Sequence, residues 1–401
     1  MLVLDDKNKC TGCAACEQKC PTNAITMVAD EEGFFYPEIN DKKCIHCNLC
    51  TKICPQENKD YMNNGPISFW GGVIKDKKIL LDSSSGGAFT AICNSINKDA
   101  IIFGVTYDDK LKVHHTWCKN GKDIAIFRKS KYLQSDVRNT YSEVKKFLNG
   151  GNIVLFTGTS CQISGLYAFL GKKPENLYTV DLICHGVPSQ KIFDAYISSL
   201  SKRKRVNISK FSFRDKSYFF GDWEIGTAYG DINKMKHQAW GEDFFMTGFL
   251  RGLFYRPSCY QCKYANSKIK RPADLTIGDF WGSEKISHRY NEKRGSSLII
   301  VNSYRGEELL YKIKKTMDLT EINREQAVIE NHNLIEPTKI DLKRDEFFSQ
   351  LIIGTDFMTI MKKYRKQKSH SQKVRVIVTK IFPWIVELKR KKVRSQRKSR
   401  I

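Results

Sequence analysis

Eight cysteines near the N-terminus stand in two blocks with the same spacing, C-x2-C-x2-C-x3-C-P. Three closely spaced thiolates can hold three corners of a [4Fe–4S] cubane. The fourth cysteine, followed by a rigid proline, then points to the cubane of the other block. Zinc sites with four cysteines use similar loops, but two copies with a crossed fourth ligand favour iron–sulfur clusters. We therefore predict one cluster on Cys10, Cys13, Cys16 and Cys54, and a second on Cys44, Cys47, Cys50 and Cys20.

Four further cysteines are candidates for a third cluster. Cys161 and Cys184 each follow a strand-like apolar run, at 153–156 and 178–183. In a parallel sheet such positions gather at the carboxyl edge, where ligands bind. Buried core thiols are the alternative for these two, and a structural zinc half-site is the alternative for the C-x2-C pair at 259–262. We predict that the third [4Fe–4S] cluster is bound by Cys161, Cys184, Cys259 and Cys262.

The 401 residues divide into zones of different composition. Residues 1–58 hold both cysteine blocks and predict a small ferredoxin-like α+β domain of βαββαβ type. Residues 59–66 form a turn-rich linker. From 67 to 340, short apolar runs alternate with amphipathic ones, which favours a larger α/β domain with a partly parallel sheet. We expect strands over 101–105, 152–157 and 178–183, and helices over 88–97, 140–148, 162–170 and 189–200.

Residues 341–401 are predicted to form a helical, strongly basic C-terminal tail. The chain has a formal net charge of +24, and residues 361–401 contribute 16 Lys or Arg against one acidic residue. The apolar stretch at 374–388 is too short and too charged to span a bilayer. It could lie on an anionic membrane surface, pack on the protein's own core or bind a partner protein. Nucleic acid is not expected, because no recognised binding module accompanies the charge.

The start of the chain has no basic segment followed by an apolar run, and no apolar run reaches the roughly 18 residues that a membrane span needs. Fourteen cysteines, many in CxxC spacing, then indicate metal or redox chemistry rather than disulfides. We expect a cytoplasmic protein, peripheral to the inner face of the membrane if the basic tail binds lipid.

Six segments of the larger domain occur in a specific order: Ser83–Phe89, Ser130–Ser135, Gly158–Gln162, Asp181–Pro188, Cys259–Cys262 and Ala273–Gly282. Together they resemble the coenzyme F-420 hydrogenase/dehydrogenase beta-subunit family, which is also known with an N-terminal two-cluster ferredoxin. The resemblance covers residues 60–340 and leaves the basic tail outside. It implies an FAD flavoprotein, usually with a [4Fe–4S] cluster in the flavin domain. The family includes deazaflavin oxidoreductases and a reductase that acts on a chlorophyll hydroxymethyl group.

The serine- and glycine-rich segment at 83–87 lies between a strand-like run and a helix, where exposed backbone N–H groups can bind an anion such as the FAD pyrophosphate. A Ser-capped helix is the alternative there, and a surface turn is the alternative for residues 131–132. The sequence has no GxGxxG, which disfavours a Rossmann dinucleotide site. We predict that FAD is bordered by Ser84, Ser85, Gly86, Gly87, Lys131 and Tyr132.

These predictions combine into an FAD-dependent iron–sulfur oxidoreductase that acts on a deazaflavin or another conjugated, anionic organic substrate. His185 could donate a proton or be a satisfied loop histidine, and Asp279 could lie near the flavin or cap a turn. The alternative is a non-catalytic electron-transfer subunit, or a membrane-docked adaptor, that feeds a separate redox partner protein. A radical-type enzyme is disfavoured, because both cluster loops are fully ligated and the CxxxCxxC trio is absent.

Overall fold

The structure is a computed structural model of the whole chain. It describes residues 6–57, 61–121, 123–216, 226–231, 234–286, 290 and 295–364. The apolar stretch predicted at 374–388, and with it most of the basic tail, lies outside the described residues. Among the described helices, none has the length and apolar character needed to cross a bilayer.

The two cysteine blocks fold into two short helices of the same shape. Each five-residue helix starts after a residue in the left-handed conformation, Ala14 at φ 57° and Asn48 at φ 55°. Each ends at the extended fourth cysteine of its block, Cys20 or Cys54. One antiparallel hairpin lies between the two helices. The two outer strands of the predicted βαββαβ order would fall near residues 1–5 and 58–60, which lie outside the described residues. The elements are α1 (Ala15–Lys19), β1 (Ile25–Ala29), β2 (Phe35–Ile39) and α2 (Leu49–Ile53).

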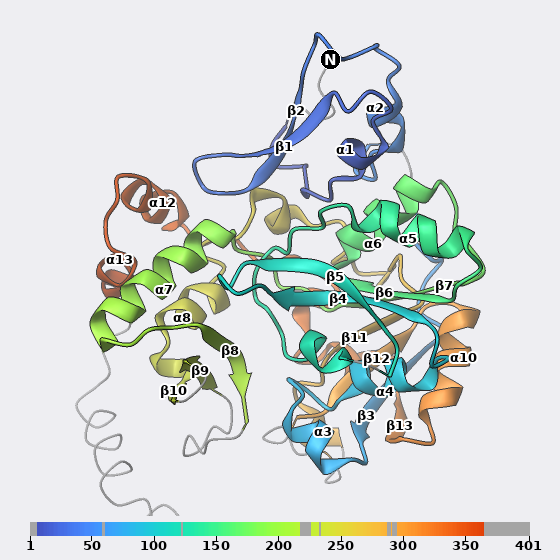
Figure 1. Cartoon of the computed structure of the whole chain (residues 1–401). Coiled ribbons are helices and arrows are strands. Elements are labelled where there is room, and N and C mark those ends of the chain that lie inside the picture. The colour runs from blue at the N-terminus through green and yellow to red at the C-terminus, as the bar shows by residue number, and fades with distance from the viewer. Residues whose placement is uncertain are drawn as a thin grey trace, which may run out of the picture.

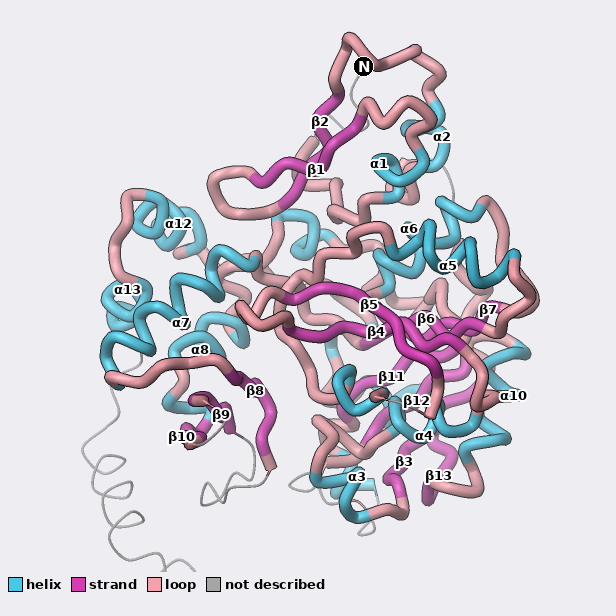
Figure 2. The backbone as a smooth tube through the Cα atoms, in the orientation of Figure 1, coloured by secondary structure: helices cyan, strands magenta, loops and turns pink. Residues whose placement is uncertain are grey.

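The larger part of the chain is built on an eight-stranded mixed sheet (Figure 2). In spatial order the strands are β13 (Met317–Ile322), β3 (Ser68–Ile74), β12 (Ser297–Val301), β11 (Leu275–Asp279), β7 (Leu177–Leu182), β6 (Val154–Gly158), β4 (Ile101–Tyr107) and β5 (Val113–Lys119). Four consecutive strands, β11, β7, β6 and β4, run parallel, and antiparallel strands extend the sheet on both sides. The predicted α/β class with a partly parallel sheet is therefore confirmed.

Helices cover both faces of this sheet (Figure 1). Successive strand residues point to opposite faces, so Ile102 and Leu155 pack on one side while Phe103 and Phe156 pack on the other. The first face is covered by α3 (Lys77–Leu81), α4 (Ala88–Ser95), η1 (Ile124–Phe127) and α10 (Tyr304–Ile313), and the second by α5 (Thr140–Asn149) and α6 (Ser160–Leu170).

A second lobe packs beside the sheet around an aromatic core. The part of the predicted tail at 341–364 belongs to this lobe, because Phe347 and Phe357 are buried in its core. The lobe contains α7 (Gln190–Lys204), the small sheet β8 (Lys210–Asp215), β9 (Gly226–Gly230) and β10 (Met235–Ala239), then α8 (Phe244–Leu250), α12 (Arg344–Ile352) and α13 (Phe357–Tyr364). The remaining short elements are η2 (Trp240–Glu242), η3 (Pro257–Gln261), α9 (Ser283–Ile286), α11 (Arg324–Val328) and η4 (His332–Leu334).

The seven predicted strands and helices of the larger domain are all present, with shifts of a few residues at their ends. Helix α6 begins at Ser160 rather than at Gln162 because Thr159 and Gln162 form a capping box, in which each side chain bonds the backbone of the other. This shift places Cys161 in the first turn of the helix.

Candidate iron–sulfur site

Four cysteines of the N-terminal part form one mutually interacting group. Every pair among these thiols is close enough to interact electrostatically. Burial, reinforced by the Cys54 and Cys10 thiols, raises the pKa of Cys13 to about 12, and burial raises the pKa of Cys16 as well. The structure thus brings together the first predicted ligand set, with its crossed fourth cysteine: Cys10, Cys13, Cys16 and Cys54.

The second predicted set lies nearer to solvent. Cys47 is exposed, and Cys44 and Cys50 are half-buried. Cys20 and Cys50 pack against the small apolar cluster of Cys16, Ile25 and Cys54, so both approach the first set. The Cys20 thiol accepts a hydrogen bond from the Ala24 N–H at 3.2 Å.

The other four predicted ligands also come together, around one pocket. Strands β6 and β7 are parallel neighbours with Gly158 opposite Asp181, so their carboxyl ends place Cys161 and Cys184 side by side. Cys259 in η3 and Cys262 directly after it complete the group. Every pair among these thiols interacts, and together they line one pocket. Burial is the main cause that raises the pKa of Cys161 to about 12 and that of Cys184 to about 11.

Two buried arginines line the same pocket. Arg271 donates to the Ser160 hydroxyl at 3.0 Å, but its Nε has no hydrogen-bond partner among the described residues. Arg256 donates from Nε to the Cys10 carbonyl at 2.7 Å. Burying two cations is costly unless an anion compensates for them. A cluster held by four thiolates would supply that negative charge, so the residues present fit a [4Fe–4S] group. No three His, Cys, Asp or Glu side chains in the described part are grouped to hold a single metal ion.

The first thiol group and the pocket meet at helix α6. A Cβ atom on Gly165 would lie 2.9 Å from the Cβ of Cys13 and 2.8 Å from the Tyr141 hydroxyl. Cys161 stands one helical turn before Gly165, and its thiol interacts electrostatically with that of Cys13. Thr11, from the loop of the first block, lines the pocket itself. The two groups of four thiols are therefore direct neighbours.

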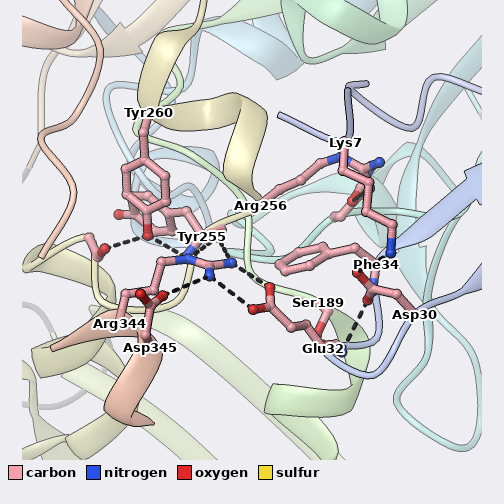
Figure 3. Close-up of polar contacts among 12 residues, drawn as sticks. Lys7, Asp30, Glu32, Phe34, Ser189, Tyr255, Arg256, Tyr260, Arg344 and Asp345 are labelled. Atoms are coloured by element: carbon pink, nitrogen blue, oxygen red, sulfur yellow. Dashed lines mark hydrogen bonds and ion pairs between the residues drawn. The ribbon is translucent and has the colours of Figure 1, made fainter. Parts of the chain in front are cut away.

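The hairpin of the N-terminal part is fastened to the second lobe by buried polar contacts (Figure 3). Arg344 of α12 makes a bidentate ion pair with Glu32 and donates to the Tyr255 carbonyl. The Ser189 hydroxyl donates to the Glu32 carbonyl at 2.6 Å. Arg256 donates to the Phe35 carbonyl at 2.9 Å. These contacts fix the orientation of both cysteine blocks relative to the pocket.

The two segments predicted to border FAD touch each other. The hydroxyl of Ser84 accepts a hydrogen bond from the N–H of Ser130 at 2.7 Å. The fold, however, explains why residue 86 is a glycine, because a Cβ atom there would lie 2.4 Å from the Gly72 carbonyl oxygen. The N–H of Gly86 donates a hydrogen bond to the Ser297 hydroxyl. The ammonium of Lys131 donates to the carbonyls of Ile126 and Arg128, where it caps η1.

A buried arginine that the sequence reasoning missed lies beside these segments. Arg214 is 1% exposed, forms an ion pair with Asp279, and lies 3.5 Å from the Tyr132 hydroxyl. Its guanidinium faces the rings of Trp240 and Trp281, and its Nε has no hydrogen-bond partner in the described part of the chain. The signal was present in the sequence, because Asp279 between aromatic residues needs a buried partner. The sequence did not show that this partner is Arg214, which lies 65 positions away in the chain.

Two known families match the chain. Residues 9–58 match the 4Fe-4S dicluster domain. Residues 151–326 match the family described as the C terminus of the coenzyme F420 hydrogenase/dehydrogenase beta subunit. The larger part of the chain is similar to this beta-subunit family over residues 151–326. The predicted resemblance to this family is thus confirmed, over residues 151–326. The N-terminal part of the chain is thus a ferredoxin-type [4Fe–4S] domain, and the larger part is related to a subunit of oxidoreductases.

Individual proteins similar to the chain differ in how much of it they cover. A component of an ion-translocating oxidoreductase complex from Methanosarcina acetivorans is 42% identical over 48 residues, which is 12% of this chain and 16% of that protein. An uncharacterized ferredoxin from Methanocaldococcus jannaschii is 32% identical over 53 residues, which is 13% of this chain and 68% of that ferredoxin. One chain of the F420-reducing [NiFe] hydrogenase complex from Methanosarcina barkeri matches with a TM-score of 0.43 and 16% identity, over 75% of this chain and 93% of that chain.

Proposed function

We propose that the protein is an FAD-dependent iron–sulfur oxidoreductase. It passes electrons between its [4Fe–4S] clusters and FAD, and FAD exchanges a hydride or electrons with a deazaflavin or another conjugated organic substrate. The cytoplasmic location stays a prediction from the cysteine content. The division into domains at 1–58, 67–340 and 341–401 belongs to the same proposal.

The observation that carries this proposal is the contact between the two thiol groups. The first group holds three cysteines of one block and Cys54 of the other, and the second group surrounds the pocket that Arg256 and Arg271 line. Clusters at these two places would be joined through Cys13 and Cys161. Electrons could then move from the second predicted cluster, through the first, to the pocket inside the larger domain.

FAD would lie where the predicted segments meet Arg214. In this proposal Ser84, Ser85, Gly87 and Tyr132 border the flavin, and Gly86 and Lys131 shape the turns around it. The unpaired Nε of Arg214 and the indole rings of Trp240 and Trp281 near its guanidinium suit an anionic group that carries a flat aromatic ring. When bound, FAD would convert single electrons into two-electron hydride chemistry. The residues of the protein would hold the flavin ring near the thiol pocket and neutralise the phosphates of FAD.

The test is anaerobic purification of the full chain, with iron, sulfide and flavin quantified. About twelve iron atoms and one FAD per chain are expected for three clusters and a flavin. About eight iron atoms without flavin would remove the FAD and third-cluster proposals and would favour a non-catalytic electron-transfer subunit.

A matched pair of variants tests the flavin position. Arg214→Gln is expected to weaken FAD binding by about 10- to 100-fold, since it removes a charged hydrogen-bond donor worth about 1.5–3 kcal/mol. Iron content should stay the same. Arg203→Gln is the control, because Arg203 pairs with Asp356 on the outer side of α7. Equal flavin content in both variants would place FAD elsewhere.

A further inference from the structure

The two cysteine blocks differ sharply in exposure, although their sequences have the same spacing. In the first block Cys10 and Cys16 are buried, and Cys13 is pressed against α6. In the second block Cys47 is exposed, and helix α2 has no buried residue. One end of the proposed electron path therefore faces the protein interior, and the other faces solvent.

The exposed block forms the tip of the molecule. The loop that joins β2 to α2 lies at the top of Figure 1, on the side of the N-terminal part that points away from the main sheet. Ile45 at this tip leaves 63% of its surface exposed, between Cys44 and Cys47. An exposed apolar side chain beside a proposed cluster is what a transient docking contact uses at its centre.

The charge of this tip is opposite to that of its surroundings. Residues 41–53 hold three lysines, Lys42, Lys43 and Lys52, against one acidic residue, Asp41. The rest of residues 1–58 holds three lysines against eight acidic residues. All three lysines of the tip are exposed. A positive patch around an exposed redox centre steers an acidic partner toward that centre.

We propose that residues 41–53 are the docking surface for a small acidic one-electron carrier protein. One electron moves between the carrier's centre and the cluster proposed on Cys44, Cys47, Cys50 and Cys20, so one is oxidised as the other is reduced and no bond changes. The proposal rests on the proposed iron–sulfur function, to which it adds the partner and its surface.

The experiment uses the full chain, purified anaerobically, in stopped-flow reduction by two probes. The first probe is pre-reduced chloroplast-type [2Fe–2S] ferredoxin, an acidic protein, and the second is reduced methyl viologen, a small cation that needs no docking surface. The test variant is Lys42→Glu with Lys43→Glu. The control is Lys77→Glu with Lys78→Glu, another pair of adjacent exposed lysines, in α3 far from the tip. Iron content is measured in all three proteins.

At low salt the test variant should react with ferredoxin at least about 10-fold more slowly than the wild type, because steering charges have been reversed. Its reaction with methyl viologen should not slow, and the control should match the wild type with both probes. In the wild type the ferredoxin rate should fall as salt rises, since the Debye length is only about 3 Å at 1 M.

An unchanged or faster ferredoxin rate in the test variant would overturn the docking surface, as would an equal loss in the control or a wild-type rate that rises with salt. A wild type that contains no iron and no acid-labile sulfide would show instead that the clusters are absent, and the proposed function would fail with it.

Discussion

Cys13 lies so close to Gly165 of α6 that a Cβ atom on the glycine would stand 3.2 Å from the Cys13 sulfur. The contact joins the part that matches the dicluster domain to the part that matches the beta-subunit family, and Cys161 is one turn away on the same helix. A side chain at position 165 would separate the two thiol groups. The glycine is therefore a structural requirement of the proposed electron path.

Gly165→Ala should impair the proposed cluster on the first group. Replacing a mid-helix glycine by alanine normally stabilises a helix by about 1 kcal/mol. Here the added methyl group meets Tyr141 and Cys13 at less than 3 Å, and overpacking of this kind costs about 1–3 kcal/mol. We expect a lower thermal midpoint and lower iron content, measured anaerobically. Gly241→Ala is the control, because a Cβ there meets nothing within 4 Å. A Gly165→Ala protein with wild-type iron and stability would contradict the close contact.

Cys259→Ser tests the third cluster. If Cys259 is one of four ligands, its loss should lower iron by about four atoms of about twelve and leave the two N-terminal clusters. Cys118→Ser is the matched control, because Cys118 is half-buried in β5 and belongs to neither thiol group. Iron and acid-labile sulfide are the measurements. Unchanged iron in the Cys259→Ser protein would remove Cys259 from the ligand set.

Much of the site could be predicted because its signals are local. The cysteine blocks carry their spacing within eleven residues each, and Cys161 and Cys184 are placed together by the rule that parallel strands end at one edge. Helix and strand positions could be predicted from the period of the apolar residues. The start of α6 differed from the prediction because of its capping box.

The contacts that orient the site could not be predicted, because they join residues far apart in the chain. Arg256 reaches the Cys10 carbonyl across 246 positions, and Arg344 reaches Glu32 across 312. No local pattern marks either arginine as buried. Gly86 shows the opposite limit of a local pattern. The pattern suggested a ligand, and the structure adds that glycine is needed there because the backbone of Gly72 and Ser297 passes close by.

Glu32→Gln should loosen the N-terminal part. Arg344 is buried and would lose the charge of its main partner, and a hydrogen bond to a charged group contributes about 1.5–3 kcal/mol. We expect faster limited proteolysis of the hairpin and a lower denaturation midpoint, with iron content near that of the wild type when the protein is freshly purified. Glu346→Gln is the control, since its ion pair with Lys343 on the same helix is exposed and should contribute little. Equal protease sensitivity in the two variants would show that the Glu32–Arg344 pair does not fasten the hairpin.

His115 should make stability fall in mild acid. Its ring is buried in β5, with Nε2 3.1 Å from the Thr157 carbonyl oxygen and Nδ1 3.0 Å from the Ser135 hydroxyl. Burial lowers the pKa of His115 to about 4, whereas an unfolded histidine has a pKa of about 6.5. Between these values the unfolded chain binds more protons than the native one, so stability decreases as pH falls. At pH 5.5 this effect should reach about 1.4 kcal/mol.

The measurement is anaerobic denaturant unfolding at pH 7.5 and 5.5 of the wild type, His115→Gln and His332→Gln. Glutamine at position 115 cannot take up the proton, so this variant should lose less stability on acidification than the wild type, by about 1.4 kcal/mol. His332 is exposed, and its variant should follow the wild type. If all three proteins lost the same stability between the two pH values, His115 would not be held neutral by its burial in β5.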